Sequence, residues 1–457
     1  MSTVSNRTAF GWGQVLTNPA VLLLVLGWLG LVLGQIRDTS PYFYPYRWWF
    51  IALLAASLLT ILSRVKFIRY TPEHRCLLVY LTIAAFSCAI SLMPEYSFAR
   101  WCTLLLMFGA VFIGAWSFIQ WPQHFRLMVT LAVVSVCLGA ISSSWYILEA
   151  GRLIPETRFT GAFGKATGTG SFAAAGIPLI LWKLRYTQGW LKVFFAGVLG
   201  ILLYMLIFSG GRAAIVGGLF ALSVWLWKHA TNWRPAMVAG MFSLVFLSTA
   251  GVLTLDMLPE YIVRRETLPT FTGRIPLWKV GLSLFGESPV IGHGYGMTRY
   301  VRVYEEFDDR PEGKIVPAPV DLLDLIPGFG SRRLGRTTLH SDHVERLVET
   351  GLVGYIPFAL FWYFILRRMA AVLQLRPNPD SSLALALGLN VLYVFLDSFM
   401  HGALFALNAP GVLLAWVGIV VFIRASEFAI GACAFRPCIS STLSTVSIPA
   451  RVGLAIR

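Results

Sequence analysis

Two histidines stand close together where an apolar run begins near residue 345. His340 and His343 are three positions apart, with Ser341 and Asp342 between them. An imidazole at the boundary between water and lipid can be neutral near pH 7 and can accept a proton. His340 is therefore a candidate general base and His343 a supporting group, and they share a face if one helix holds both. His340 could instead cap that helix, and a metal site from these residues would lack both H-E-x-x-H and a fourth ligand.

Two arginines follow glycine-containing turns. Arg212 ends the sequence Ser-Gly-Gly-Arg between two apolar segments, and Arg274 ends Thr-Gly-Arg. At a helix N-terminus Arg212 is unfavourable against the helix dipole unless an anion also binds there, and free N–H groups beside a guanidinium form a good phosphate site. Arg212 could alternatively reach lipid headgroups, and Arg274 could be an ordinary solvated charge. The glycines of 289–296 do not match a dinucleotide fingerprint and predict a tight turn.

A third glycine-rich stretch begins at Arg158 and contains Lys165. It resembles a phosphate-binding P-loop only superficially, because Phe159 occupies the position of the first glycine and Ala166 follows the lysine. We therefore expect no nucleotide site here. Arg158 or Lys165 could return with this loop to an anion site.

Apolar residues dominate the chain and place these motifs in a membrane protein. Of the 457 residues, 57% are hydrophobic and 13% are charged, whereas soluble chains carry about 25% charged residues. Mean hydropathy is +0.69. This composition excludes a disordered chain, a coiled coil or a nucleic-acid arm. A spanning helix needs roughly 20 mostly apolar residues, and twelve segments of that kind lie near 19–36, 47–63, 76–93, 99–119, 125–147, 169–184, 191–209, 212–228, 235–255, 346–366, 383–400 and 403–424.

The basic residues predict how the chain is oriented in the membrane. The net charge of +15 suggests basic loops that meet anionic lipid, or an anionic substrate. Loops after even-numbered segments hold more Lys and Arg than loops after odd-numbered segments, so we expect both termini in the cytoplasm. The first segment lacks a clear cleavage motif and is interpreted as a retained helix. The six cysteines lack the spacing of a disulfide framework or a zinc site. We expect nine helices in 1–255, a large periplasmic loop or cap in 256–344, three helices in 345–425 and a cytoplasmic tail in 426–457.

In this order, the motifs resemble those of the O-antigen ligase family. The sharpest match is to H-[NSQ]-x9-G-x-x-[GTY], which His340, Ser341, Gly351 and Gly354 satisfy. A second family element, R-x-x-x-L, is matched by Arg264 to Leu268. The Ser-Gly-Gly-Arg and Thr-Gly-Arg sequences complete the pattern.

This resemblance covers roughly residues 155–365 and implies both a fold and an activity. The fold is all-α, polytopic and GT-C-like, with about twelve transmembrane helices and one large periplasmic loop. The activity is transfer of a glycan from undecaprenyl diphosphate to a lipid A-core sugar, in a bacterial inner membrane with the active site facing the periplasm. It implies no cofactor, no metal and no nucleic acid, with membrane lipid as surroundings. The sequence does not indicate an oligomeric state.

The resemblance also implies a role for each candidate residue. His340 is the general base on the acceptor hydroxyl, and the displacement inverts the anomeric carbon. Guanidinium groups suit a diphosphate, whose negative charge grows as it leaves. The residues assigned to it are Arg212, Arg274, Arg158 and Arg265, and those assigned a supporting part are Arg264, Lys165 and His343.

Three alternative functions remain open. An O-antigen polymerase or a protein O-oligosaccharyltransferase uses the same donor with another acceptor. A proton-coupled exporter or flippase of an anionic lipid belongs to a different class. Transporters usually place ionisable groups near the bilayer midplane, whereas here the helix centres carry almost no charge, with Asp397 the main exception.

Overall fold

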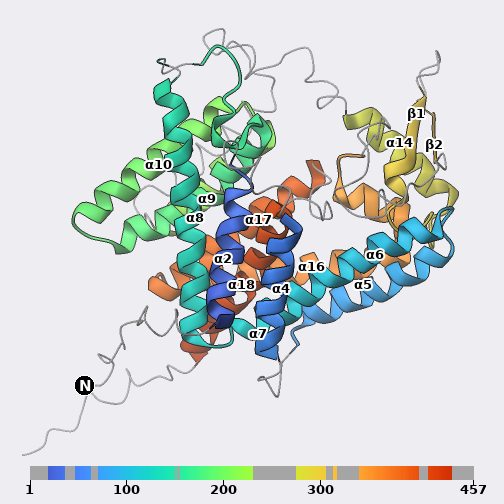
Figure 1. Cartoon of the computed structure of the whole chain (residues 1–457), viewed down its shortest axis with the longest axis horizontal. Coiled ribbons are helices and arrows are strands. Elements are labelled where there is room, and N and C mark those ends of the chain that lie inside the picture. Colours follow the sequence, from blue (N-terminus) through green and yellow to red (C-terminus); the bar gives the residue numbers. More distant parts are fainter. Residues whose placement is uncertain are drawn as a thin grey trace, which may run out of the picture.

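Helices make up nearly all of the secondary structure in the part of the chain that can be described. The computed structural model describes residues 19–36, 47–62, 70–149, 151, 155–229, 274–304, 312–315, 339–400 and 410–434. The helices are α2 (Pro19–Leu33), α4 (Arg47–Leu62), α5 (Pro72–Ala89), α6 (Pro94–Phe108), α7 (Trp116–Phe118), α8 (Pro122–Glu149), α9 (Ala166–Tyr186), α10 (Trp190–Phe208), α11 (Arg212–His229), α14 (Arg274–Glu287), α16 (Asp342–Gln374), α17 (Pro379–Met400) and α18 (Pro410–Ala434). A π-helix, Gly109–Ala115, lies between α6 and α7. Figure 1 shows α5 and α6 running together obliquely away from α2, α4 and α8.

Most of the predicted apolar segments coincide with helices. Eleven of the twelve overlap a helix in the described residues, and the ninth, 235–255, lies outside them. Within the described chain, six helices are long and apolar enough to cross a membrane. They are Pro94–Phe118, α8, α10, α16, α17 and Leu413–Gly431 of α18. The protein is therefore a largely helical, multi-pass membrane protein.

Helix α17 lies at the centre of the bundle. Nine consecutive residues, 381–389, are buried, so this stretch is covered on every side. Helices α9, α11, α16 and α18 pack around it (Figure 1). Small residues allow close approach: a Cβ on Gly217 would lie 2.6 Å from Tyr393 Cδ2, and one on Gly388 would lie 2.5 Å from Met369 Sδ.

Helix α16 is two helices joined at a break. Gly351 has φ 60° and ψ −166°, which is not helical backbone. A short helix, 342–350, therefore precedes a long one, 352–374. The sequence predicted a single helix over 346–366, and this is wrong in two respects. The helical segment begins earlier, at Asp342, and it is interrupted at a glycine that hydropathy alone does not distinguish from its neighbours.

The described part of the predicted 256–344 stretch is folded. It contains α14 and an antiparallel hairpin of β1 (Val301–Tyr304) and β2 (Glu312–Ile315), with Val301 opposite Ile315. Helix α14 packs against α16 and β2. We call residues 274–304 and 312–315 the cap. Figure 1 shows α14 and the hairpin near the joined ends of α5 and α6. One end of the bundle carries the cap, the loop at 155–165 and the α10–α11 turn, and we refer to it as the cap end.

Ion pairs hold the other end of the bundle. Arg368 of α16 forms two hydrogen bonds to Glu73 of α5, one of them from Nη2 to Oε2 at 3.2 Å. The Glu73 side chain is 1% exposed. Arg368 also lies 3.8 Å from Glu427 of α18, which pairs with Arg424 at 3.0 Å. Because these are buried or half-buried charges, they depend on one another for their neutralisation.

Candidate active site

The α10–α11 turn presents a backbone carbonyl and an arginine at the cap end. Helix α10 ends at Phe208 and α11 begins at Arg212, which is half-buried. Gly210 has φ 60°, a left-handed conformation that favours glycine. The buried Ser209 hydroxyl donates to Leu206 O at 3.0 Å and accepts from Gly211 N at 3.3 Å. Arg212 therefore stands at the first position of a helix, where unpaired N–H groups and the helix dipole favour an anion.

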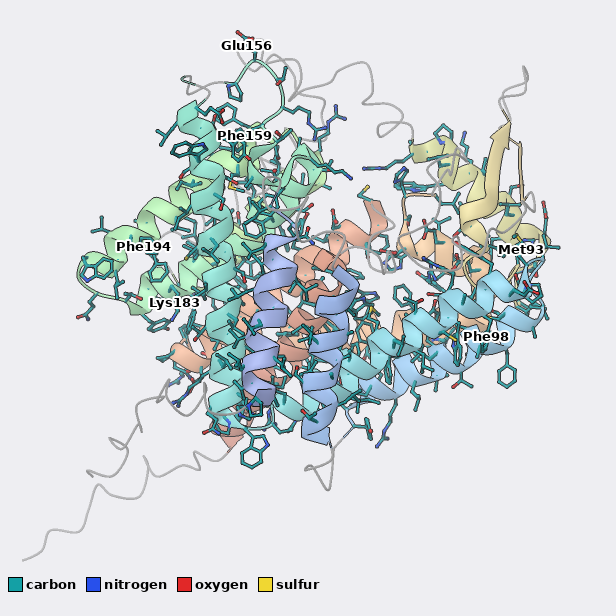
Figure 2. The ribbon with its side chains drawn as sticks, viewed as in Figure 1. Met93, Phe98, Glu156, Phe159, Lys183 and Phe194 are labelled. Carbon is teal, nitrogen blue, oxygen red and sulfur yellow. The ribbon has the colours of Figure 1, made fainter. Side chains whose placement is uncertain are left out.

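The loop before α9 brings Arg158 to this same turn. Arg158 Nε donates to Ser209 O at 2.7 Å, and Phe159 N donates to Phe208 O at 2.8 Å. Figure 2 shows Phe159 and Glu156 together at this end of the bundle, with Lys183 of α9 lying farther away. Arg158 and Arg212 are thus attached to one turn. Lys165, in contrast, is exposed at the residue before α9, and the described contacts do not connect it to this turn.

Helix α9 connects the arginine turn to α17. A Cβ on Gly170 would lie 2.5 Å from Ser209 Oγ, so the start of α9 touches the turn directly. The next residue, Ser171, places its side chain beside the hydroxyl of Tyr393 on α17. Tyr393 in turn lies beside Asp397, one turn farther along α17.

Arg274 lies near the same end of α17. It is the first residue of α14, is half-buried, and interacts electrostatically with Asp397. Burial lowers the pKa of Arg274 from its usual value, and the negative charge of Asp397 opposes that shift. A guanidinium remains protonated throughout the physiological range. Like Arg212, Arg274 is therefore a fixed positive charge at a helix N-terminus.

His343 is the third contact with the end of α17. Its Nε2 lies 3.1 Å from Ser398 Oγ, and its Nδ1 lies 3.1 Å from the Tyr355 hydroxyl. Its ring stacks on Phe399 with the ring centres 3.8 Å apart. Because both ring nitrogens face hydroxyl groups and the side chain is buried, His343 is suited to positioning α17 against α16.

His340 differs from His343 in exposure and in backbone conformation. It is exposed and has φ 50°, the only non-glycine residue with positive φ in the described chain. Ser341 is the N-cap of the short helix, and its hydroxyl accepts from Val344 N at 3.4 Å. His340 is therefore not the capping residue, and it precedes the helix, so the two histidines do not share a helix face. An exposed imidazole at this position is accessible to a substrate hydroxyl.

The last turns of α17 join the four sequence motifs into one region. Tyr393 contacts Ser171 of α9, Asp397 faces Arg274, and Ser398 contacts His343. The arginine turn reaches the same region through α9. Two of the candidate residues, Arg264 and Arg265, lie outside the described residues. Within the described chain, no group of three or more His, Cys, Asp or Glu side chains is arranged to hold a metal ion.

Two features of this region were missed in the sequence. Asp397 was treated only as an exception to uncharged helix centres, although an ionisable residue in an apolar segment is a functional signal by default. The short helix also carries a buried ionic cluster, in which Arg346 Nη1 lies 2.6 Å from Glu349 Oε2 and Nη2 lies 3.4 Å from Glu345 Oε2. Three charges within five residues of an otherwise apolar run were the available signal.

Comparison with known proteins shows a family match over part of the chain. A family model described as O-antigen ligase matches residues 196–359, which is just over a third of the chain. The matched stretch begins in α10 and ends in the long part of α16, and it includes Arg212, Arg274, His340 and Gly351. It does not include Arg158 or Asp397. No curated protein matches the chain.

Proposed function

We propose that the chain, which carries an O-antigen ligase family domain, transfers a glycan from undecaprenyl diphosphate to a lipid A-core sugar. The membrane-spanning helices and the family domain support a membrane glycosyltransferase. We further propose a GT-C-like bundle of twelve spanning helices in a bacterial inner membrane, with the cap end facing the periplasm.

The observation that carries the proposal is the set of contacts at the end of α17. Arg274 faces Asp397 and His343 contacts Ser398, while the turn that carries Arg212 touches α9, which in turn contacts Tyr393. A third arginine, Arg158, is attached to the Arg212 turn. Fixed positive charges and a potential base at the same end of the bundle suit a diphosphate-linked sugar donor, because its leaving group must be held while its sugar is attacked.

In the proposed reaction His340 takes the proton from the acceptor hydroxyl. The oxygen then attacks the anomeric carbon, a new glycosidic C–O bond forms, and the bond from that carbon to the diphosphate oxygen breaks. The diphosphate leaves with the bonding electron pair. Arg212, Arg274 and Arg158 stabilise its added negative charge. Attack opposite to the leaving group inverts the configuration of the carbon.

The exposure of His340 and the burial of His343 separate their roles. A general base must reach the proton that it removes, directly or through one water. His340 is exposed and can be reached by a substrate hydroxyl, whereas His343 is buried between α16 and α17. We therefore assign proton transfer to His340 and support of the site to His343. Of the remaining candidates, Arg265 is proposed as a fourth arginine that binds the diphosphate. Arg264 and Lys165 are proposed as peripheral charges.

The test is transfer by purified protein from a lipid-diphosphate glycan to lipid A-core, with and without a chelator. We expect product in both conditions, and a rate about 10²–10⁴-fold lower for His340→Ala, the usual contribution of one general base. His124→Gln is the control, because His124 stacks on Phe118 away from the cap end. Full activity of His340→Ala would remove this residue from the mechanism.

The acceptor decides between related activities in the same assay. Product formed only with a second lipid-linked glycan would identify a polymerase, and product formed only on a Ser- or Thr-containing peptide would identify a protein transferase. Movement of the donor lipid across a bilayer, dependent on a proton gradient and without a new bond, would identify a transporter.

A further inference from the structure

We propose that Thr298 and Glu349 form a positioning contact through which the cap sets the orientation of the short helix 342–350 and of His340 before it. Only the kinetic consequence of this inference rests on the proposed function. Its structural basis is the way in which the break in α16 is joined to the cap. We call residues 289–298 and 348–353 together the junction.

The backbone of the cap replaces the helical hydrogen bonds that are lost at the break. His293 N donates to Val348 O at 2.9 Å, and Gly294 N donates to Glu349 O at 3.0 Å. On the other side of the break, Leu352 N donates to Pro289 O at 2.9 Å and Val353 N to Val290 O at 3.1 Å. The end of the short helix and the start of the long helix are therefore both completed by the cap rather than by each other.

Glycines allow the two backbones to touch at the junction. A Cβ on Gly292 would lie 2.5 Å from the carbonyl carbon of Glu349, and one on Gly351 would lie 2.3 Å from Val290 O. Contacts this close leave no room for a side chain. The short helix is thus held by the cap on one side and by its single-residue connection to the long helix on the other.

A buried carboxylate adds a side-chain hydrogen bond between the cap and the short helix. Thr298 Oγ1 of the cap donates to Glu349 Oε1 at 2.5 Å, and the Glu349 side chain is 1% exposed. Glu349 also pairs with Arg346, whose guanidinium lies 5.3 Å from the ring centre of Tyr295 in the cap and donates to the Tyr80 hydroxyl at 3.2 Å. In a buried site these interactions are strong and directional.

For the proposed reaction, loosening the junction should affect the chemical step but not the binding of the donor. His340 precedes Ser341, the N-cap of the short helix, whereas Arg212 and Arg158 are held by α9, α10 and α11. Arg274 belongs to the cap, but it faces Asp397 of α17, which lies outside the junction. Loosening the junction should therefore displace the base without changing the arginine turn. A base displaced by about 1 Å can slow a reaction about 10²-fold. The expected signature is a lower kcat with an unchanged donor KM.

The experiment compares Thr298→Val with Thr298→Ser in the full-length protein. Valine keeps the shape of threonine and removes the donor, while serine keeps the donor. We expect about 10- to 100-fold lower kcat for Thr298→Val, donor KM within about twofold of wild type, and near wild-type rates for Thr298→Ser. Thr103→Val is the matched control, because Thr103 Oγ1 donates to Ala99 O within α6. Wild-type kcat in Thr298→Val, an equal loss in Thr298→Ser, or a loss carried by donor KM would overturn the inference.

A spectroscopic measurement tests the junction without relying on activity. Spin labels are placed at Lys279→Cys on the exposed face of α14 and at His340→Cys, after replacement of the six native cysteines. The distribution of distances between the two labels should be narrow in the labelled protein with Thr298 unchanged and in the same protein with Thr298→Ser. It should be broader or shifted with Thr298→Val. Identical distributions in all three proteins refute the positioning role. If wild-type protein transfers no glycan, the proposed function fails while this measurement still decides the inference.

Discussion

Replacing Gly351 by alanine tests the break in α16 most directly. The residue has φ 60°, a conformation that costs a non-glycine residue about 1–3 kcal/mol. The new Cβ would also lie 2.3 Å from Val290 O and 2.4 Å from Val290 C, so the backbone of the cap must move. Overpacking of this kind typically costs about 1–3 kcal/mol. The expected loss of folding free energy is the sum, about 2–6 kcal/mol.

The measurement is thermal unfolding of purified Gly351→Ala in detergent, together with glycan transfer. Because the clash separates the cap from α16, we expect a melting temperature several degrees below wild type and a large loss of transfer. Gly200→Ala is the matched control: Gly200 lies within α10, and a Cβ added there would meet nothing within 4 Å. There, alanine should stabilise the helix by about 0.5–1 kcal/mol.

One result would refute this reasoning. Gly351→Ala could unfold at the same temperature as the wild type and transfer glycan at the same rate. In that case α16 is continuous through residue 351 when the protein is in the membrane. The junction is then not part of the structure that the protein adopts in the membrane. A loss of stability in Gly200→Ala equal to that in Gly351→Ala would show instead that any added methyl group is harmful.

Three further predictions concern charged residues. Arg212→Lys should raise the donor KM about 10- to 100-fold, since a lysine cannot form a bidentate contact with a phosphate, and an unchanged KM would exclude Arg212 from the proposed diphosphate site. In a double-mutant cycle with Arg274→Gln and Asp397→Asn, kcat/KM should show a coupling of about 0.5–3 kcal/mol, whereas additive losses would mean that the two groups act independently. Arg368→Met should destabilise the protein by about 3–5 kcal/mol because Glu73 is left buried and unpaired, and adding Glu73→Leu should recover most of the melting temperature.

The positions of the helices could be predicted because hydrophobic length alone determines them. Apolar runs of about 20 residues occur wherever a helix crosses lipid, and the described helices other than α14 overlap them. The break at Gly351 could not be found in this way, since one residue with positive φ barely changes hydropathy. It was visible only as the glycine in the family motif, whose structural reason is a backbone contact with a distant segment.

The types of the candidate residues were also easier to predict than their arrangement. Arg212 was expected at a helix start from its turn sequence, and it does begin α11. Arg274 also begins a helix, α14, which its turn sequence did not predict. The spacing of His340 and His343 suggested a shared face, but the helix starts after His340, because Ser341 provides its cap. Asp397 joins Arg274 across more than a hundred residues of sequence, and local patterns carry no information on such a pair.

The burial of residues 381–389 of α17 has a consequence for how the proposed enzyme would accommodate its substrates. A helix enclosed by four neighbours cannot slide or rotate unless a densely packed interior rearranges. Its far end, with Asp397 and Ser398, is then stationary, and in the proposed reaction the glycan would be aligned against it. Any closing movement around the substrate must come from the peripheral parts, and α17 itself stays in place.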